Sequence, residues 1–272
     1  MSVKSLKKKE LKLNNKPKVV AIIQARMSST RLPGKVLLPL AGKPVLWWIA
    51  KRALLAEFVD VAVIATTWDS KNDPINGFCN YEGVFDDIDK GCVLYRYTGK
   101  ENDVIGRVIA AANFRRADIV VDITADCPAI DPKHIDKLIK KLKMLKDQNL
   151  DYVSNDVVSR SWPDGLDIQV YWTDALIKCK RLFNPQQHCG WNIAQHPEVF
   201  NIHHWRARPS MRWPELGLTL DTLEDYEMLK VLFDKFGKDD SGFSAETVIK
   251  FLKKNREYIT NADVRRKTPE EG

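Results

Sequence analysis

The sequence predicts an α/β fold with a doubly wound, mostly parallel sheet. Short apolar strands rich in β-branched residues alternate with helical segments, a pattern typical of parallel strands joined by crossover helices. The 272 residues suit one large domain of this class, and a hydrophobic content of 44% is normal for a folded globular protein. The longest apolar runs are far shorter than the ~20 residues of a membrane span, so we expect no insertion into a membrane.

The elements of the first half follow from the spacing of apolar residues. A continuous apolar run is typical of a strand buried on both faces, and apolar residues at helical spacing predict helices. Strands are expected at 19–23, 61–65 and 118–124. Helices are expected at 43–58, 75–82, 102–114 and 131–146, the last opened by Asp131-Pro132.

The second half alternates less regularly and predicts a mixed lobe inserted at about 150–215. Strands are expected at 151–154, 166–172, 199–205 and 216–220. Helices are expected at 173–182, 223–236 and 245–258, the first of them capped by Thr173. We therefore expect a basic tail over 1–17, one domain over 18–258 that contains the lobe, and a C-terminal tail over 259–272.

The formal net charge of +7 is concentrated at the N-terminus. Residues 1–18 hold seven lysines and one glutamate, so the rest of the chain carries only +1. The tail is either a solvated terminus or an arm that contacts an anionic surface. No nucleic-acid partner is expected, because the sequence after the tail shows no basic stretch interleaved with aromatic residues. The tail lacks the apolar core of a secretory signal and the five cysteines form no CxxC pair, so we expect reduced thiols and a cytoplasmic location.

The segment after the first strand concentrates residue types that bind phosphate. It reads Gln24-Ala25-Arg26-Met27-Ser28-Ser29-Thr30-Arg31-Leu32-Pro33-Gly34-Lys35, and we call it the cationic loop. It leaves the carboxyl end of a parallel strand, where open α/β sheets bind ligands. Backbone N–H groups, hydroxyls and three cations can form a cradle for a polyphosphate. The spacing is neither a Walker A loop nor a dinucleotide-binding GxGxxG, and an ordinary charged surface loop is the alternative.

Two aspartates that follow expected strands indicate a magnesium site. Asp126 lies at the carboxyl end of 118–124, at the same sheet edge as the cationic loop, and Asp221 follows 216–220. A carboxylate beside a polyphosphate is repelled unless a divalent cation lies between them, and Mg²⁺ prefers one or two carboxylates plus phosphate oxygens. Either aspartate alone is also typical of a turn or a helix cap, and Thr222 with Asp225 matches a capping box. Asp122 begins inside a strand and is the poorer ligand.

Three other motifs resemble sites but lack a supporting pattern. Asp87-Ile88-Asp89 matches the DxD of nucleotide-sugar transferases, but no expected strand leads into it. His203 and His204 are adjacent on an expected strand and therefore face opposite sides. Trp47-Trp48, on an expected helix, is typical of core or interface residues.

The segment VVAIIQARMSSTRLPGKVLLPLAGKPVLWWIAKRAL closely resembles the opening of the cytidylyltransferases that make CMP-activated sugar acids. The resemblance is closest to the spore-coat polysaccharide biosynthesis type, which is related to the CMP-Kdo and CMP-acylneuraminate synthetases. ITADCPAIDP, PDGLDIQVYW and LTLDTLEDYEMLK resemble later blocks of that group, in family order from about 18 to 236.

The resemblance implies a Rossmann-like nucleotidyltransferase fold, CTP as donor, Mg²⁺ as cofactor and a homodimer formed through the inserted lobe. It places the metal on Asp126 and Asp221 and implies four catalytic residues: Arg26, Lys35, Asp126 and Asp221. The implied nucleotide-binding residues are Gln24, Ala25, Arg26, Ser28, Ser29, Thr30, Arg31, Lys35, Thr66, Thr67, Asp103, Arg107 and Asp126.

The chain departs from the family pattern where an acceptor is expected to bind. Gln187-His188-Cys189-Gly190-Trp191 stands in place of something like EHVTP, and Gln169 replaces a usual acid. The candidate acceptor-binding residues are Asp164, Gly165, Asp167, Gln169 and His188. An ordinary turn is the alternative for Asp164-Gly165.

The hypothesis for the chemistry is attack of an acceptor oxygen on the α-phosphorus of CTP, with pyrophosphate as the leaving group. Such a reaction needs positioning and charge neutralisation more than covalent catalysis. A sugar-acid hydroxyl must lose a proton, whereas a phosphate or phosphonate acceptor is already anionic. Two alternatives are a glycosyltransferase on a similar nucleotide-binding fold, using a nucleotide-sugar donor, and a non-catalytic binding protein that uses the basic tail.

Overall fold

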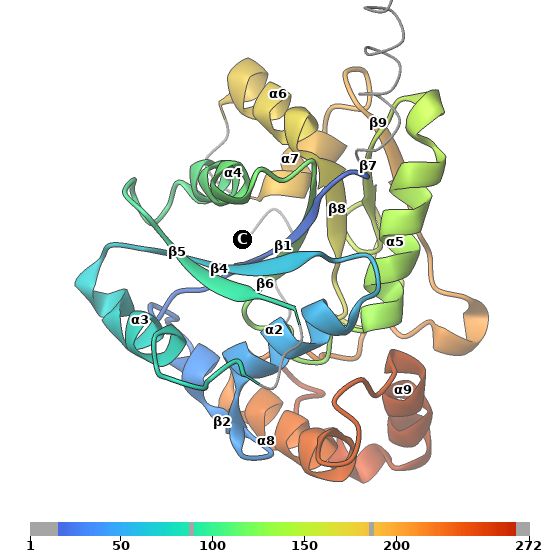
Figure 1. Ribbon diagram of the computed structural model, residues 1–272. Helices are drawn as coiled ribbons and strands as arrows, with labels where there is room; N and C mark the ends of the chain where they lie inside the picture. The colour runs from blue at the N-terminus through green and yellow to red at the C-terminus, as the bar shows by residue number, and fades with distance from the viewer. Residues whose placement is uncertain (1–15, 87–89, 185–187, 265–272) are drawn as a thin grey trace, which may run out of the picture.

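The computed structural model describes residues 16–86, 90–184 and 188–264, and a seven-stranded sheet lies at its centre (Figure 1). The strands are β1 (Val19–Gln24), β4 (Val61–Thr67), β5 (Cys92–Tyr97), β6 (Ile119–Thr124), β7 (Leu150–Ser154), β8 (Gln169–Trp172) and β9 (Asn201–His204). Their order across the sheet is β5-β4-β1-β6-β8-β7-β9. Among these described strands only β8 runs against its neighbours. The predicted α/β fold with a mostly parallel sheet is confirmed.

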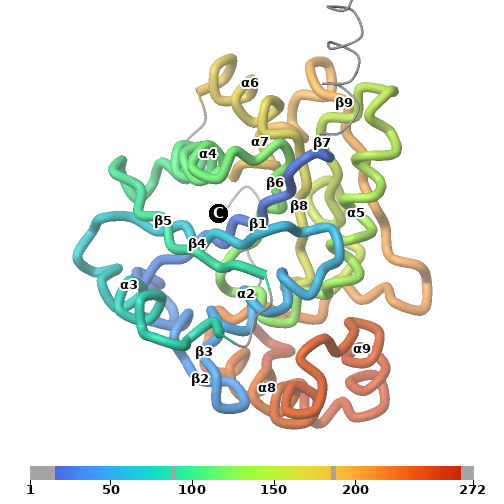
Figure 2. The backbone as a smooth tube through the Cα atoms, viewed as in Figure 1, coloured from blue at the N-terminus to red at the C-terminus, as the bar shows by residue number. Residues whose placement is uncertain are grey.

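Helices cover both faces of the sheet because successive strand residues point to opposite sides. Val19, Ala21 and Ile23 of β1 pack in one core, and Val20 and Ile22 pack in the other. The first core contains α2 (Val45–Leu55), α5 (Pro132–Met144), α8 (Leu223–Leu232) and α9 (Ala245–Lys254). The second contains α4 (Val104–Arg115), α6 (Thr173–Phe183) and α7 (Cys189–Ala194). Figure 2 shows α8 and α9 as the outermost layer on the α2 side.

The remaining elements are short. The strands β2 (Pro39–Leu40) and β3 (Lys43–Pro44) form a separate antiparallel pair, and α3 (Asp73–Cys79) follows β4. All five cysteines are free. The described residues contain no helix long and apolar enough to cross a membrane.

The segment 150–215, predicted as a mixed lobe, supplies β7, β8 and β9, and these strands continue the central sheet. β8 pairs antiparallel with both β6 and β7, whereas β9 pairs parallel with β7. The limits of an inserted lobe and its part in a dimer stay predictions. The motif Asp87-Ile88-Asp89 and most of the basic tail lie outside the described residues.

Four details of the predicted elements are wrong. Residues 216–220 form no strand: their strand-like pairing within the described residues is limited to one isolated bridge, Asp164 to Gly217. Strand β5 was not predicted, since it is half-buried along its length and shows little alternation. The short helix α7 was also missed. Thr173 does not cap α6, because its hydroxyl donates instead to the Ala117 carbonyl at 2.7 Å.

Arg52 of α2 ties the first core together from inside. Its side chain is fully buried and donates to four backbone carbonyls, those of Ala129, Ile130, Ser241 and Phe243, at 2.6 to 3.3 Å. Burial lowers the pKa of Arg52 to about 10, with Asp131 acting in the opposite direction. The guanidinium thereby holds the backbone after Asp126 against the segment that precedes α9.

Replacing this guanidinium should destabilise the whole domain. Arg52→Ala leaves four buried carbonyls without a donor, so we expect the free energy of unfolding to fall by about 3 kcal/mol or more. Urea unfolding measures the change, and Arg181→Ala, at an exposed position of α6, is the control with the same loss of charge. Equal stability of the two variants would contradict the stabilising role given to the Arg52 guanidinium.

Candidate active site

The cationic loop begins at the carboxyl end of β1, which lies between β4 and β6. Gln24 is in register with Ala65 on one side and with Thr124 on the other, so the loop leaves the middle of the sheet. The Gly34 N–H donates to the Met27 carbonyl at 3.2 Å and closes the loop. Gly34 has φ 72°, a left-handed conformation that glycine adopts at little cost. The chain then enters a short 3-10 helix that begins with the buried Lys35.

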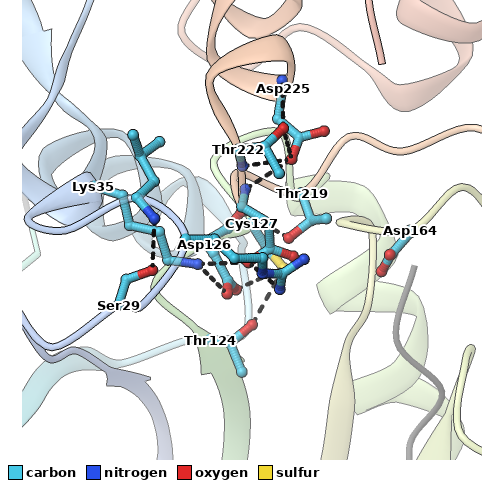
Figure 3. Close-up of polar contacts among 12 residues, drawn as sticks. Ser29, Lys35, Thr124, Asp126, Cys127, Asp164, Thr219, Thr222 and Asp225 are labelled. Carbon is cyan, nitrogen blue, oxygen red and sulfur yellow. Dashed lines mark hydrogen bonds and ion pairs between the residues drawn. The ribbon is translucent and has the colours of Figure 1, made fainter. Parts of the chain in front are cut away.

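The Lys35 ammonium joins the loop to both predicted aspartates. Its Nζ lies 2.9 Å from Asp126 Oδ2 and 2.8 Å from Asp221 Oδ1. Arg31 reaches the same Asp221 oxygen at 3.0 Å. Three stretches that are far apart in the sequence therefore meet at one sheet edge, and Figure 3 shows Lys35 and Asp126 at their meeting point.

Backbone hydrogen bonds place Asp221 beside Asp126. The carbonyl of Asp126 accepts from the Leu220 N–H at 2.8 Å and from the Thr219 hydroxyl at 3.3 Å. The predicted capping box of α8 is present: Thr222 and Asp225 bond each other reciprocally (Figure 3). Because Asp225 caps the helix, the Asp221 carboxylate is available to face Lys35.

Electrostatics keeps Lys35 and Asp126 ionised in spite of burial. For Lys35, burial alone would lower the pKa, but the charges of Asp126 and Asp221 outweigh it and the pKa is raised. For Asp126, burial would raise the pKa, but Lys35 outweighs it and the pKa is lowered. The result is a charged triad of Lys35, Asp126 and Asp221, to which Arg31 adds a second cation at Asp221.

This triad lies in a cavity of about 440 Å³. Fourteen of the predicted site residues line it: Gln24, Arg26, Ser28, Ser29, Thr30, Arg31, Lys35, Arg107, Asp126, Asp221, Asp164, Asp167, Gln169 and His188. The residues predicted to bind the nucleotide and those predicted to bind the acceptor therefore line the same cavity. Asp164 stands apart from the Lys35–Asp126 contact within it (Figure 3).

The other predicted site residues lie behind the described lining rather than in it. Thr66 and Thr67 are buried, and the Thr67 hydroxyl accepts from Asn72 at 2.9 Å. Asp103 caps α4 through the Gly106 N–H and pairs with Lys180 at 2.8 Å. Ala25 is a buried residue of the cationic loop itself.

Gly165 forms a turn that touches the segment preceding Asp221. Its φ is 97°, and a Cβ there would lie 2.3 Å from the backbone of Leu218 and Thr219. Only glycine permits this close approach. Gly165 therefore forms a turn, which was the alternative to a role in binding the acceptor. The contact brings Asp164 and Asp167 to the cavity.

Sequence reasoning missed a polar network that holds the cationic loop. Glu101 accepts from the Ser28 hydroxyl and, at 3.1 Å, from the Asn72 amide. Asn72 in turn accepts from the Met27 N–H at 2.8 Å. Arg107 donates to the Glu101 carbonyl at 2.9 Å. No local pattern marks Glu101 or Asn72, because their partners lie in a distant part of the sequence.

The sequence also did not predict a contact between Gln24, a predicted nucleotide-binding residue, and Asp122. The Gln24 amide donates to Asp122 at 2.5 Å, and Tyr171 donates to the other carboxylate oxygen at 3.0 Å. Burial raises the pKa of Asp122. This bond fixes the Gln24 side chain at the floor of the cavity.

The donor set fits Mg²⁺ shared with a phosphate ligand. No cluster of three or more His, Cys, Asp or Glu side chains able to hold a metal exists among the residues the structure describes. Two carboxylates instead converge on one cation, the Lys35 ammonium. Mg²⁺ is commonly held by one or two carboxylates, with phosphate oxygens completing its ligands.

Comparisons with known proteins find similarity to cytidylyltransferases. A family model described as cytidylyltransferase matches residues 20–163. The spore coat polysaccharide biosynthesis protein SpsF of Bacillus subtilis is 30% identical over 253 residues, 90% of this chain and 98% of SpsF. A 3-deoxy-manno-octulosonate cytidylyltransferase of a Psychrobacter species is 32% identical over 176 residues, 61% of each chain. The structure of a cytidylyltransferase from Leptospira borgpetersenii is similar with a TM-score of 0.78 at 27% identity, covering 92% of this chain and 100% of that one.

Removing the Lys35 charge should change how stability depends on pH. The lowered pKa of Asp126 means that the pairing stabilises the fold above the unfolded carboxyl pKa of about 3.9 and is lost as pH falls through the folded value. Lys35→Met should therefore cost about 2 kcal/mol near neutral pH, and the difference from wild type should narrow below about pH 4.

Urea unfolding at a series of pH values measures this difference. Lys254→Met, at an exposed position of α9, is the matched control and should show little pH-dependent effect. A stability difference for Lys35→Met that is the same at pH 7 and pH 3 would refute the proposed charge balance.

Proposed function

The chain belongs to the cytidylyltransferase family of nucleotidyltransferases, and on this premise we propose that it transfers CMP from CTP to a small anionic acceptor, releasing pyrophosphate. The observation that carries the proposal is the convergence of the cationic loop with Asp126 and Asp221 on one cavity. A sugar acid is the favoured acceptor, because one relative is named as a 3-deoxy-manno-octulosonate cytidylyltransferase. A homodimer and a cytoplasmic location stay predictions.

The cationic loop supplies the binding site for the triphosphate. Arg26, Arg31 and Lys35 bring three positive charges to the carboxyl end of β1, and all three line the cavity. They would bind the β- and γ-phosphates and stabilise the negative charge that develops on pyrophosphate as it leaves. Ser28, Ser29 and Thr30 add hydroxyl donors from the same loop.

Mg²⁺ is the proposed cofactor, with Asp126 and Asp221 as its protein ligands. When bound, it would neutralise phosphate charge and lower the pKa of the acceptor hydroxyl. Lys35 would then remain as a cation that keeps both carboxylates oriented.

The nucleoside part of CTP is assigned to the β4–α4 side of the loop. Gln24 and Arg107 line the cavity there. Thr67 and Asp103 would act indirectly: Thr67 through Asn72, and Asp103 as the cap of the helix that carries Arg107.

A nucleotide screen tests the proposed donor and reaction. The enzyme with Mg²⁺ should release pyrophosphate from CTP, and not from ATP, GTP or UTP, when a panel of sugar acids and phosphonates is supplied. Pyrophosphate release is followed by a coupled phosphate assay. Turnover of a nucleotide sugar without pyrophosphate would instead favour the glycosyltransferase alternative.

Loss of either carboxylate should abolish turnover without unfolding the protein. Asp126→Ala and Asp221→Ala each remove a proposed metal ligand, so we expect pyrophosphate release to fall at least ~100-fold. Thermal unfolding checks that the fold survives, and Asp239→Ala, at an exposed position, is the control. Near-normal turnover in either site variant would overturn the metal assignment.

A further inference from the structure

The first half of the cationic loop is anchored at Met27, between two residues that line the cavity. Arg26 and Ser28 belong to the lining, whereas Met27 between them does not. The Met27 N–H donates to the Asn72 side chain at 2.8 Å, and the Met27 carbonyl accepts from two later N–H groups of the same loop at 3.0 and 3.2 Å. The backbone of Met27 is therefore held from both sides, and this fixes the starting point of the two lining side chains.

Asn72 is the buried centre of this anchor. Its side chain is fully buried, and Oδ1 accepts from the Met27 N–H. The other side-chain atom, Nδ2, donates to the Thr67 hydroxyl at 2.9 Å and to Glu101 Oε2 at 3.1 Å. Because Met27 requires an acceptor, the amide must turn both of its N–H donors toward Thr67 and Glu101. Asn72 thus joins the loop after β1 to the end of β4 and to the segment before α4.

Glu101 connects this anchor to the lining residues. Its Oε1 accepts from the Ser28 hydroxyl and lies 3.9 Å from the Arg26 guanidinium. Its backbone carbonyl accepts from Arg107, a third residue of the lining, at 2.9 Å. The described lining includes neither Glu101 nor Asn72, so any effect of these two residues on a ligand must pass through the residues they hold.

We propose that Asn72 and Glu101 are positioning residues for the triphosphate of the donor, which hold Arg26 and Ser28 in the geometry that binds it. This inference rests on the proposed function and adds two residues to it. The Arg26 side chain is 56% exposed, and a long exposed side chain loses conformational freedom when a ligand immobilises it. A fixed backbone and a carboxylate beside the guanidinium lower that cost before the ligand binds.

The bond between Asn72 and Glu101 allows a test in which its polarity is reversed. Combining Asn72→Asp with Glu101→Gln exchanges the N–H donor and the oxygen acceptor between the two positions. The new carboxylate at position 72 can still accept from the Met27 N–H, and the new amide oxygen at position 101 can still accept from the Ser28 hydroxyl. The Thr67 hydroxyl can rotate to donate to position 72. Net charge and the number of hydrogen bonds are both conserved.

Each single change should weaken binding of the triphosphate. Asn72→Asp places two carboxylates face to face, so we expect the KM for CTP to rise about tenfold or more. Glu101→Gln gives Ser28 and Arg26 a neutral partner in place of a charged one, so a rise of about threefold or more is expected. The KM for the acceptor should stay unchanged. Calorimetry with CTP and with inorganic tripolyphosphate, each with Mg²⁺, should show the same increases in Kd.

The sign of the second change distinguishes positioning from a general loss of stability. Glu101→Gln weakens binding in the wild-type background, but in the Asn72→Asp background it should restore most of the lost affinity, because the hydrogen bond forms again. Asn113→Asp combined with Glu227→Gln makes the same replacements at exposed positions and is the control. Thermal unfolding checks each variant, and Glu101→Gln, at a partly exposed position, together with the double variant decides the test if Asn72→Asp does not fold.

Two sets of outcomes separate this inference from the proposed function. Unchanged Kd values in both single variants, a double variant as impaired as Asn72→Asp, or an equal rise in KM for CTP and for the acceptor overturns the inference. Wild-type protein that binds neither CTP nor tripolyphosphate overturns it too. Wild-type protein that binds both but releases no pyrophosphate overturns the proposed function, and the binding constants alone then decide the inference.

Discussion

The site depends on the ion pairs that the Lys35 ammonium forms with Asp126 and Asp221. Asp126 and Asp221 converge on the ammonium of Lys35, whose side chain is only 10% exposed, and two half-buried carboxylates so close together would repel each other without it. The proposed Mg²⁺ and triphosphate would bring further charges of both signs to the same place. Lys35 therefore allows the loop and the two aspartates to lie together in the folded chain.

Backbone hydrogen bonds also connect separate parts of the cavity wall. The segment before Asp221 accepts from the Asp164 N–H at 3.0 Å and donates to the Asp164 carbonyl, and it then donates to the Asp126 carbonyl. Close approach at Gly165 makes this possible. The irregular segment 216–220 therefore connects the end of β6 to the turn at Asp164 and Gly165.

The parts of the site that the sequence predicted are those set by local pattern. A buried parallel strand followed by cations and glycine, or by an aspartate, indicates a ligand-binding sheet edge whatever the rest of the chain does. Glu101 and Asn72 were missed because their roles come from tertiary neighbours. The same reason explains Thr173, a residue type suited to a helix cap that bonds instead to a carbonyl 56 residues away in the sequence.

The two aspartates at Lys35 reach the site by different routes. Asp126 follows β6 directly and lies within the region 20–163 that the family model matches, whereas Asp221 lies beyond that region. Asp221 is placed by hydrogen bonds from Thr219 and Leu220 to the Asp126 carbonyl. The geometry around Lys35 therefore depends on tertiary contacts between the matched region and the segment that follows it.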